Sequence, residues 1–145
     1  MSLRYQEQQL GVLIGSKSGT TRTAIALVST YDATTTKSIE TGGFSQIVLD
    51  VNYTMGATET SNSIEIKVEV SQDGTNFYRL MNEGVSGGTS TLTVREFTYT
   101  GVNAAAAPIS LPLDVMYKYM KFSFKETGVA SNVGSVYAEY CLSGQ

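Results

Sequence analysis

Apolar and charged residues alternate in the stretch between Ser63 and Leu80. The apolar positions are Ile64, Ile66, Val68 and Val70, and the charged residues between them are Glu65, Lys67 and Glu69. Because successive side chains of a β-strand point to opposite faces, one face of this stretch must be apolar and the other charged. The pair Asp73-Gly74 follows and predicts a turn, since glycine reaches positive φ angles without steric cost. The stretch therefore predicts a β-hairpin in an antiparallel sheet that packs on one face.

Similar strand and turn signals recur along the chain and predict about eight short strands. The predicted strands span residues 23–30, 36–40, 45–54, 63–71, 77–81, 89–100, 117–125 and 134–142. Turn-rich segments separate them, including residues 84–88 and 101–112. Further inward-facing sets are Ile47, Leu49, Val51 and Tyr53 in one strand and Met120, Phe122 and Phe124 in another. We therefore expect an all-β fold, an antiparallel β-sandwich or jelly roll, with a closed barrel as the alternative.

The first 22 residues differ from the rest of the chain. They combine several glutamines, the run Gly-Ser-Lys-Ser-Gly and a single apolar cluster, and no alternation begins before Thr23. We expect residues 1–22 to form an N-terminal arm and residues 23–145 to form a single β-sandwich domain. One alternative is a disordered terminus. The other is an arm that becomes ordered against a neighbouring subunit, for which the partner-contact residues would be Leu10, Val12, Leu13 and Ile14.

Composition limits the partners and the setting of this fold. The chain of 145 residues fits one domain, and its single cysteine, Cys141, has no partner for an internal disulfide. A net charge of −3 argues against a nucleic-acid partner, which recruits clustered Lys and Arg. We find no export signal and no apolar run approaching the roughly 20 residues of a membrane-spanning helix. We expect synthesis in the cytoplasm and no membrane partner.

The residue types that most catalytic sites need are scarce. The chain contains no histidine, which removes Ser-His and Cys-His nucleophilic pairs and the commonest general base. Glu65 and Glu69 share a strand face, but four residues of strand separate them by about 13 Å. The paired carboxylates of glycosidases lie about 5 to 9.5 Å apart. We therefore interpret the charged face as a solvated surface and expect no catalytic residue and no enzyme activity.

The sequence does not fully match either of two ligand-binding motifs. Residues 11–18 nearly match a phosphate-binding loop, but Ser16 replaces the glycine that should precede Lys17, and Gly19-Thr20-Thr21 does not open a helix. The aspartates are scattered and form no EF-hand loop, which leaves open only a Ca²⁺ site assembled from distant loops. We expect neither a cofactor nor a bound metal.

Aromatic and basic residues interleave between Tyr117 and Lys125. Tyr117, Tyr119 and Lys121 could stack on a single-stranded nucleic acid, but the net negative charge disfavours this. The segment is better interpreted as a core strand with lysines on its outer face. Tyrosine combines a large contact area with a polar tip, so Tyr117 and Tyr119 are candidates for surface contact with a subunit or ligand.

Two segments together resemble a pattern of known virion proteins. They are Ser-Gln-Asp-Gly-Thr-Asn-Phe-Tyr-Arg-Leu, residues 71–80, and Tyr-Lys-Tyr-Met-Lys-Phe-Ser-Phe, residues 117–124. The pattern consists of a strand, the motif Ser-x-Asp-Gly, an aromatic residue and a second strand, followed later by a strand that contains Tyr and Lys. It recurs in small β-sandwich virion proteins of tailed phages and in carbohydrate-binding modules. The phage group is the closer one, and within it the chain resembles head decoration, or cement, proteins.

This resemblance implies a structural function rather than a catalytic one. Decoration proteins commonly bind the capsid exterior as trimers and brace it against the pressure of the packaged DNA. The implied partners are the major capsid protein and two further copies of the chain in a homotrimer, and the implied location is the virion after synthesis in the host cytoplasm. The alternative is a carbohydrate-binding module of a tail fibre or secreted protein, against which the absence of tryptophan counts.

Overall fold

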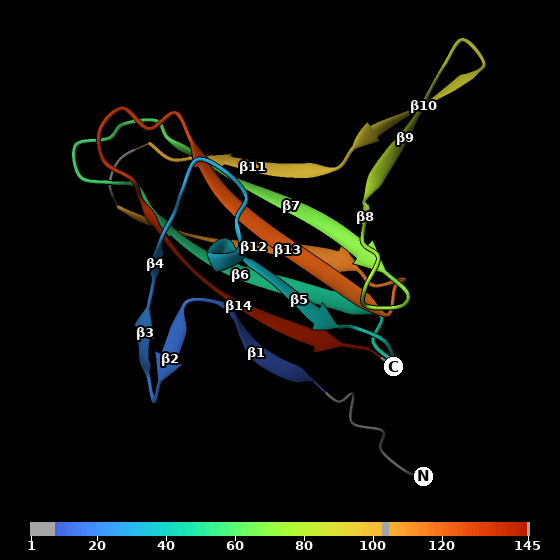
Figure 1. Ribbon diagram of the computed structural model, residues 1–145, viewed down its shortest axis with the longest axis horizontal. Helices are drawn as coiled ribbons and strands as arrows, with labels where there is room; N and C mark the ends of the chain where they lie inside the picture. Colours follow the sequence, from blue (N-terminus) through green and yellow to red (C-terminus); the bar gives the residue numbers. More distant parts are fainter. Residues whose placement is uncertain (1–7, 103–104, 145) are drawn as a thin grey trace.

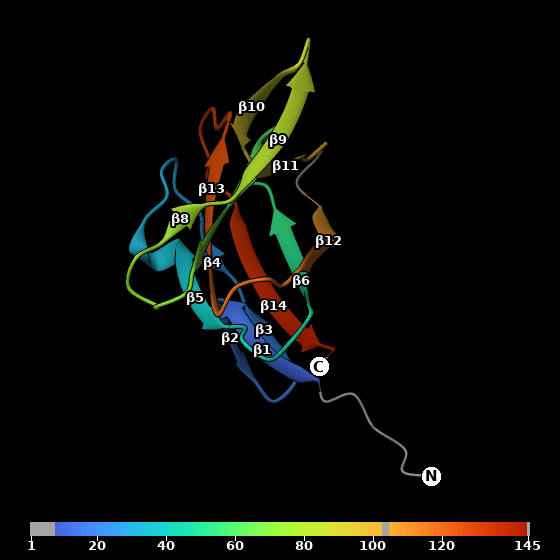
Figure 2. The ribbon, with the colours of Figure 1, turned by 90° about the vertical axis from the view of Figure 1, so that its right-hand side faces the viewer.

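The computed structural model describes residues 8–102 and 105–144, which fold into two antiparallel sheets packed face to face (Figure 1). Figure 2 shows β5, β8 and β13 on one side of the molecule and β6, β12 and β14 on the other. Among the described residues the only helical element is a 3-10 turn, η1 (Ala33–Thr35), and no helix is long and apolar enough to cross a membrane. The expected all-β sandwich is confirmed.

Each sheet contains five strands, and two hairpins stand apart from them. The first sheet has the order β1 (Gln9–Ile14), β14 (Ser135–Ser143), β6 (Gln46–Thr54) and β12 (Ala106–Asp114), and β4 (Ile25–Ala26) also pairs with β14. The second has the order β11 (Glu96–Thr100), β7 (Ser63–Ser71), β13 (Tyr119–Thr127) and β5 (Thr36–Glu40), and β8 (Tyr78–Arg79) also pairs with β7. The separate hairpins are β2 (Ser16–Ser18) with β3 (Thr21–Thr23), and β9 (Met81–Ser86) with β10 (Thr89–Val94).

The core lies between the sheets and contains the residues that alternation assigns to the inner faces. All three predicted inward sets are buried, together with residues of β14: Ile47, Leu49, Val51, Tyr53, Ile64, Ile66, Val68, Val70, Met120, Phe122, Phe124, Val136, Ala138 and Leu142. Burial of one large apolar side chain contributes about 1.5–3 kcal/mol before chain entropy is subtracted. The four core strands β6, β7, β13 and β14 therefore carry most of the stability.

The predicted turn-rich segment 101–112 proves to contain most of β12, a nine-residue strand. Pro108 and Pro112 and a run of alanines hide its alternation, although Ile109, Leu111 and Leu113 face inward to different degrees. Proline is tolerated because β12 pairs only with β6 and lies at the edge of its sheet. A second difference concerns residues 89–100, which form two strands separated at Arg95.

The N-terminal segment joins the sandwich instead of extending away from it. β1 pairs with β14, and a register shift between Val12 and Ile14 marks a β-bulge. The bulge turns the consecutive residues Leu13 and Ile14 into the core, where they are 2% and 4% exposed. This irregularity explains why the sequence shows no alternation here. Residues 9–14 of the predicted arm therefore belong to the sandwich, while residues 1–7 lie outside the described residues.

The β2–β3 hairpin, which completes the predicted arm, is tied to the first sheet by charge. Arg22 donates to the carboxylate of Glu139 on β14 at 3.0 Å, and Lys17 lies 3.5 Å from the same oxygen. The hydroxyl of Tyr137 also donates to this carboxylate, and with Arg22 it lowers the pKa of Glu139 to about 2. The hairpin is thus held beside β14 by side chains, since its own residues are exposed.

Candidate contact surfaces

The β9–β10 hairpin projects from the body of the sandwich, as both ribbon views show (Figure 1, Figure 2). Its register places Val94 opposite Met81 and Leu92 opposite Glu83. Since side chains alternate between the faces of a strand, four apolar residues share one face with Glu83 and Ser90: Met81, Val85, Leu92 and Val94. The opposite face carries only small or polar residues: Asn82, Gly84, Ser86, Thr89, Thr91 and Thr93.

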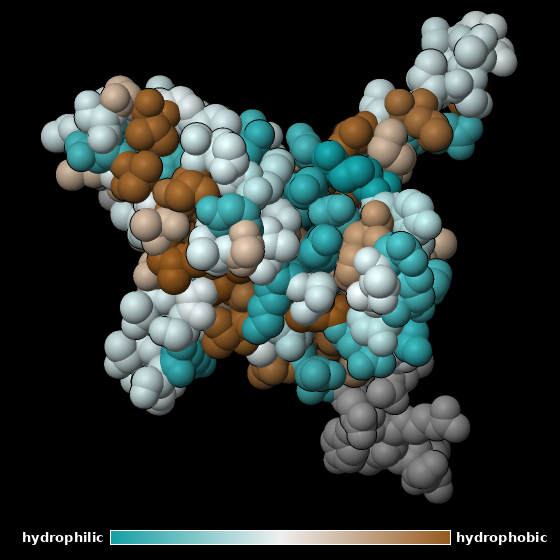
Figure 3. All heavy atoms as spheres, viewed as in Figure 1, coloured by the Kyte–Doolittle hydropathy of each residue, from teal (hydrophilic) through white to brown (hydrophobic). Residues whose placement is uncertain are grey.

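The apolar face of this hairpin is uncovered. Val85 is 71% and Leu92 is 68% exposed, and Met81 and Val94 near the base are 38% and 44% exposed. Figure 3 shows the hairpin standing clear of the body, with hydrophobic residues along its stem and less hydrophobic ones at its tip. An isolated two-stranded hairpin is only marginally stable in water, so this face is suited to contact with another surface.

The base of the hairpin is fixed to the second sheet. The amide of Arg95 donates to the carbonyl of Leu80 at 2.8 Å, and the amide of Leu80 donates to the carbonyl of Val68 on β7 at 3.1 Å. Arg79 also forms an ion pair with Glu96 across the point where the hairpin leaves the sheet. The direction of the hairpin is therefore set by the backbone of the sandwich.

A groove of about 350 Å³ opens between the edge strands β11 and β12. Its apolar lining comes from both sheets: Ile66, Phe97, Tyr99, Ile109 and Leu111. All except Ile66 are half-buried residues packed against the core. The opposite side of the sandwich is closed, because Leu13 and Ile14 fill the core there and Lys37 of β5 donates to the carbonyl of Val12 at 2.9 Å. The two sides thus differ in how completely their apolar residues are covered.

The charged outer face of β7 is more covered than the sequence predicts. Lys125 pairs with Glu65 at 3.1 Å, and Lys67 pairs with Glu69 at 3.3 Å. The ammonium groups of Lys67 and Lys125 lie 4.8 and 4.7 Å from the centre of the Tyr31 ring. Burial raises the pKa of Tyr31 to about 12. These glutamates are therefore paired with lysines in a half-buried ionic network.

The predicted contact residues Tyr117 and Tyr119 both lie near the Asp73-Gly74 turn. The Tyr119 ring covers Gly74, where an added Cβ would lie 3.2 Å from the ring, and Gly74 has φ +76°. Tyr117 lines a second pocket of about 450 Å³ together with Tyr78, which is 68% exposed. Tyr117 and Tyr119 are both half-buried, so Tyr78 offers the larger free aromatic surface at this site.

The turn beside this pocket is rigid because its carboxylate is fully engaged. Asp73 accepts hydrogen bonds from the amides of Thr75 and Asn76, both at 2.8 Å, from the Asn76 side chain at 2.7 Å and from the Ser71 hydroxyl at 2.9 Å. The amides of Asn76 and Thr75 are the main reason that the pKa of Asp73 lies far below its usual range. Asp73 therefore organises the predicted hairpin turn.

Two buried carboxylates hold the loops at one end of the sandwich, and neither was predicted from the sequence. Glu126 is fully buried and accepts from the Asn62 side chain at 2.8 Å and from the amide of Gly134 at 2.6 Å. Glu59 accepts from three successive amides, Ala130 at 3.0 Å and Ser131 and Asn132 at 2.7 Å. The amides of Asn132, Ala130 and Ser131 lower the pKa of Glu59 to about 2.

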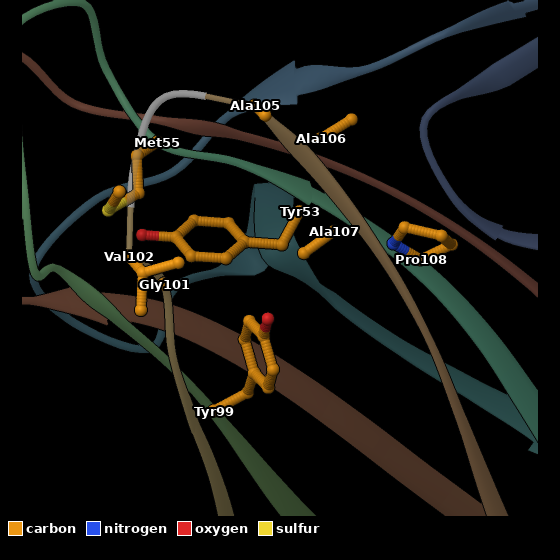
Figure 4. A pocket seen from close by; sticks show the side chains of 9 residues that line it. All are labelled: Tyr53, Met55, Tyr99, Gly101, Val102, Ala105, Ala106, Ala107 and Pro108. Carbon is orange, nitrogen blue, oxygen red and sulfur yellow. The ribbon is translucent and has the colours of Figure 1, made fainter.

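A smaller pocket of about 290 Å³ lies at the same end, between the end of β11 and the start of β12 (Figure 4). Figure 4 shows the Tyr53 ring at its centre, with the hydroxyl directed toward Met55 and Val102 and with Tyr99 below it. Within the described residues this hydroxyl is buried without a hydrogen-bond partner. Burial, reinforced by the charge of Glu126, raises the pKa of Tyr53. No cluster of three metal-ligating side chains occurs in the part of the chain that the structure describes.

The structure distributes the predicted contact residues unequally between surface and core. Leu10 is 73% exposed, Val12 is half-buried, and Leu13 and Ile14 are inside the core, where they are unavailable to a partner. The uncovered face of β9–β10 was not predicted. Alternation of apolar and polar residues is visible at Leu92 and Val94. It does not show, however, whether an apolar face packs against the core of the protein or remains exposed.

No protein-family model matches the sequence, and no curated protein matches it either. Solved structures do match. The SPBc2 prophage-derived protein YomS is similar over 99% of this chain and 99% of its own, with 14% sequence identity and a TM-score of 0.46. A structure of Bacillus endospore appendages, described as disulfide-linked pili, is similar over 99% of this chain and 91% of its own, with 10% identity and a TM-score of 0.37. Both TM-scores lie below 0.5, so neither likeness bears on the function of this chain.

Proposed function

We propose that the chain is a non-enzymatic structural virion protein, a capsid decoration or cement protein that binds the major capsid protein on the exterior of a phage head. The main support is the placement of exposed apolar side chains on two separate elements of a rigid sandwich. The β9–β10 hairpin and β1, which carries Leu10, lie on different sides of the molecule, with the hairpin above β1 in Figure 1 and Figure 2. One of these elements can contact a sister subunit while the other contacts the capsid.

The mechanism proposed is adhesion by many copies. Each copy contributes a small apolar contact, and copies joined to one another bind a repetitive surface with an avidity well above that of one contact. The carboxylates that anchor the loops, Glu59 and Glu126, make hydrogen bonds within the chain. These bonds hold the loops of each copy in place by contacts of its own.

Cosedimentation of the protein with intact capsids of the encoding phage tests this proposal. Deletion of residues 1–14 would be a poor test, because Leu13 and Ile14 belong to the core. Leu10→Ser is suitable, since an exposed side chain contributes little to folding. We expect it to weaken capsid binding at least tenfold with an unchanged melting temperature. Val133→Ser, which changes another exposed apolar residue, is the matched control and should bind normally.

Capsid resistance gives a second measurement. Capsids carrying the wild-type protein should withstand a higher temperature or lower ionic strength before releasing DNA than capsids without it. Absence of wild-type binding to capsids would contradict the proposal directly, and so would binding without any gain in resistance.

The second candidate function, carbohydrate binding, is favoured by the pocket of Tyr78 and Tyr117. Its lining combines these rings with the polar side chains of Gln72, Asn76 and Arg79, a pairing of aromatic surface and directional polar groups that suits a sugar. Saturable binding on a glycan array that Tyr78→Ala abolishes, with capsid binding intact or absent, would favour this function. An array without signal would eliminate it.

A further inference from the structure

The apolar face of the β9–β10 hairpin and the groove between β11 and β12 are complementary surfaces of one chain. We infer that the hairpin of one copy binds in this groove of a second copy, with Val85 and Leu92 against Phe97, Ile109 and Leu111. The inference concerns free copies in solution and does not depend on binding to a capsid.

The hairpin cannot fill the groove of its own copy. β10 continues through Arg95 directly into β11, and the hydrogen bond from the Arg95 amide to Leu80 fixes the base of the hairpin. From that base the hairpin projects beyond the sheet, away from the edge along which β11 runs (Figure 1). Folding back onto the groove would require these bonds and the Arg79–Glu96 ion pair to break. Any hairpin that occupies the groove must come from another copy.

The dimensions of the two surfaces match. Packed sheets lie about 10 Å apart and paired strands about 4.8 Å apart, so a ribbon of two strands spans the opening between two sheet edges. The six-residue strands β9 and β10 extend about 20 Å, and the five-residue strand β11 extends about 17 Å. A hairpin laid along the groove would cover its length and place one complete face against it.

The chemistry of the two surfaces also matches. The hairpin offers aliphatic side chains on one face only, and the groove offers half-buried aliphatic and aromatic side chains that are already packed on one side. Glu83 is the one charged residue on the apolar face and lies opposite Leu92; it belongs to β9, which is the outer strand of the hairpin if β10 pairs with β11. On the closed side of the sandwich, Leu13 and Ile14 fill the space between the two sheets. No described residue of the same copy does so in the groove, where Val85 and Leu92 of a second copy would provide the missing apolar side chains.

The hydrogen-bonding edge available for this contact is that of β11. The strand β10 carries no charge and no proline, so its free edge can pair with a further strand. β11 has polar residues at Glu96, Thr98 and Thr100 and pairs only with β7, which leaves one edge of it open. The contact is therefore expected to combine packing in the groove with backbone pairing along β11.

Each copy uses its hairpin in one contact and its groove in another. Such a head-to-tail contact is heterologous, and it closes into a ring if the rotation between copies permits. A closed ring of copies would use every hairpin and every groove.

Complementation between two variants tests the inference. Val85→Ser/Leu92→Ser damages the hairpin, and Ile109→Ser/Leu111→Ser damages the groove. We expect sedimentation velocity to show association of the wild type and at least tenfold weaker association of each variant alone. Mixed together, the two variants should form a one-to-one heterodimer, because one intact hairpin and one intact groove remain. Asn82→Ser/Thr91→Ser places two serines on the opposite face of the same strands and should associate like the wild type.

Several results would overturn the inference. The first is a wild type that stays monomeric even at 100 times the concentration used for sedimentation velocity. The others are a hairpin variant that associates like the wild type, and hairpin and groove variants that fold but do not associate when mixed. If the groove variant does not fold, Leu92→Cys and Ile109→Cys in a Cys141→Ser background replace it. Oxidation should then crosslink two copies, and a crosslink absent under association conditions would overturn the inference. Failure of capsid binding with complementation intact would contradict only the proposed function.

Discussion

The two ends of the sandwich differ in how far their side chains are buried. At the loop end, Glu59 and Glu126 are buried and each accepts hydrogen bonds from the chain itself, while Gly56 and Gly134 leave no space for a Cβ beside the neighbouring backbone. At the hairpin end, Val85 and Leu92 contact water. Residues at the first end determine whether the chain folds, and residues at the second determine what the folded chain can bind. Substitutions at the two ends should therefore change different measurements.

The largest effect is expected at Glu126. Glu126→Ala removes the acceptor of two hydrogen bonds and leaves the Asn62 side chain and the Gly134 amide buried without a partner. Each buried group left unpaired costs about 1–3 kcal/mol, so the free energy of unfolding should fall by about 3 kcal/mol. Urea unfolding measures this change.

Glu126→Gln is the matched variant, because it keeps the shape but turns one accepting oxygen into a donor that faces a donor. It should lose less stability than Glu126→Ala but still lose some, by about 1–2 kcal/mol. If both variants unfold like the wild type, the loop end does not depend on this carboxylate.

An intermediate effect is expected from acid at Glu59. Its pKa is about 2 in the folded chain, against a usual value of 4.5, so the ionised form is favoured by folding. The resulting stabilisation is complete above the unfolded pKa and is lost as the pH falls through about 4.5 to about 2. Wild-type stability should therefore fall over this range, and Glu59→Gln should show a shallower fall in unfolding measured at several pH values. Equal slopes would show that other groups cause the acid sensitivity.

The smallest effect on folding is expected at the hairpin. Val85→Ser/Leu92→Ser should change the free energy of unfolding of the dilute monomer by no more than about 0.5 kcal/mol, because both residues are exposed. The same variant should show the largest loss of association. A drop of several kcal/mol in the monomer would mean that the hairpin packs on its own chain, and the contrast between the two ends would then disappear.

The strands at the centre of the fold could be predicted because their apolar and polar residues alternate strictly. β7 and β5 occupy the predicted residues because one face of each is covered by the core and the other meets polar surroundings. β12 escaped prediction because Pro108 and Pro112 are turn signals, and only its edge position, a tertiary property, makes them compatible with a strand. β1 escaped because a bulge breaks its alternation at Leu13 and Ile14.

The contact surfaces were less predictable than the core strands, because exposure, like an edge position, is set by tertiary structure. Residue type made Tyr117 and Tyr119 candidates, but it could not show that Tyr78, a tyrosine of another predicted strand, is far more exposed. The charged face of β7 is shielded by Tyr31, which is more than thirty residues away in sequence. Coverage of a face depends on distant segments, and a local pattern carries no information about them.

The two prolines of β12 have a consequence for the behaviour of the chain before any assembly exists. A nine-residue edge strand would otherwise offer newly made copies a template for uncontrolled sheet extension, the first step of aggregation. Pro108 and Pro112 interrupt that template at two points. Two residues thereby protect the chain against the fibrous aggregates that β-rich proteins tend to form.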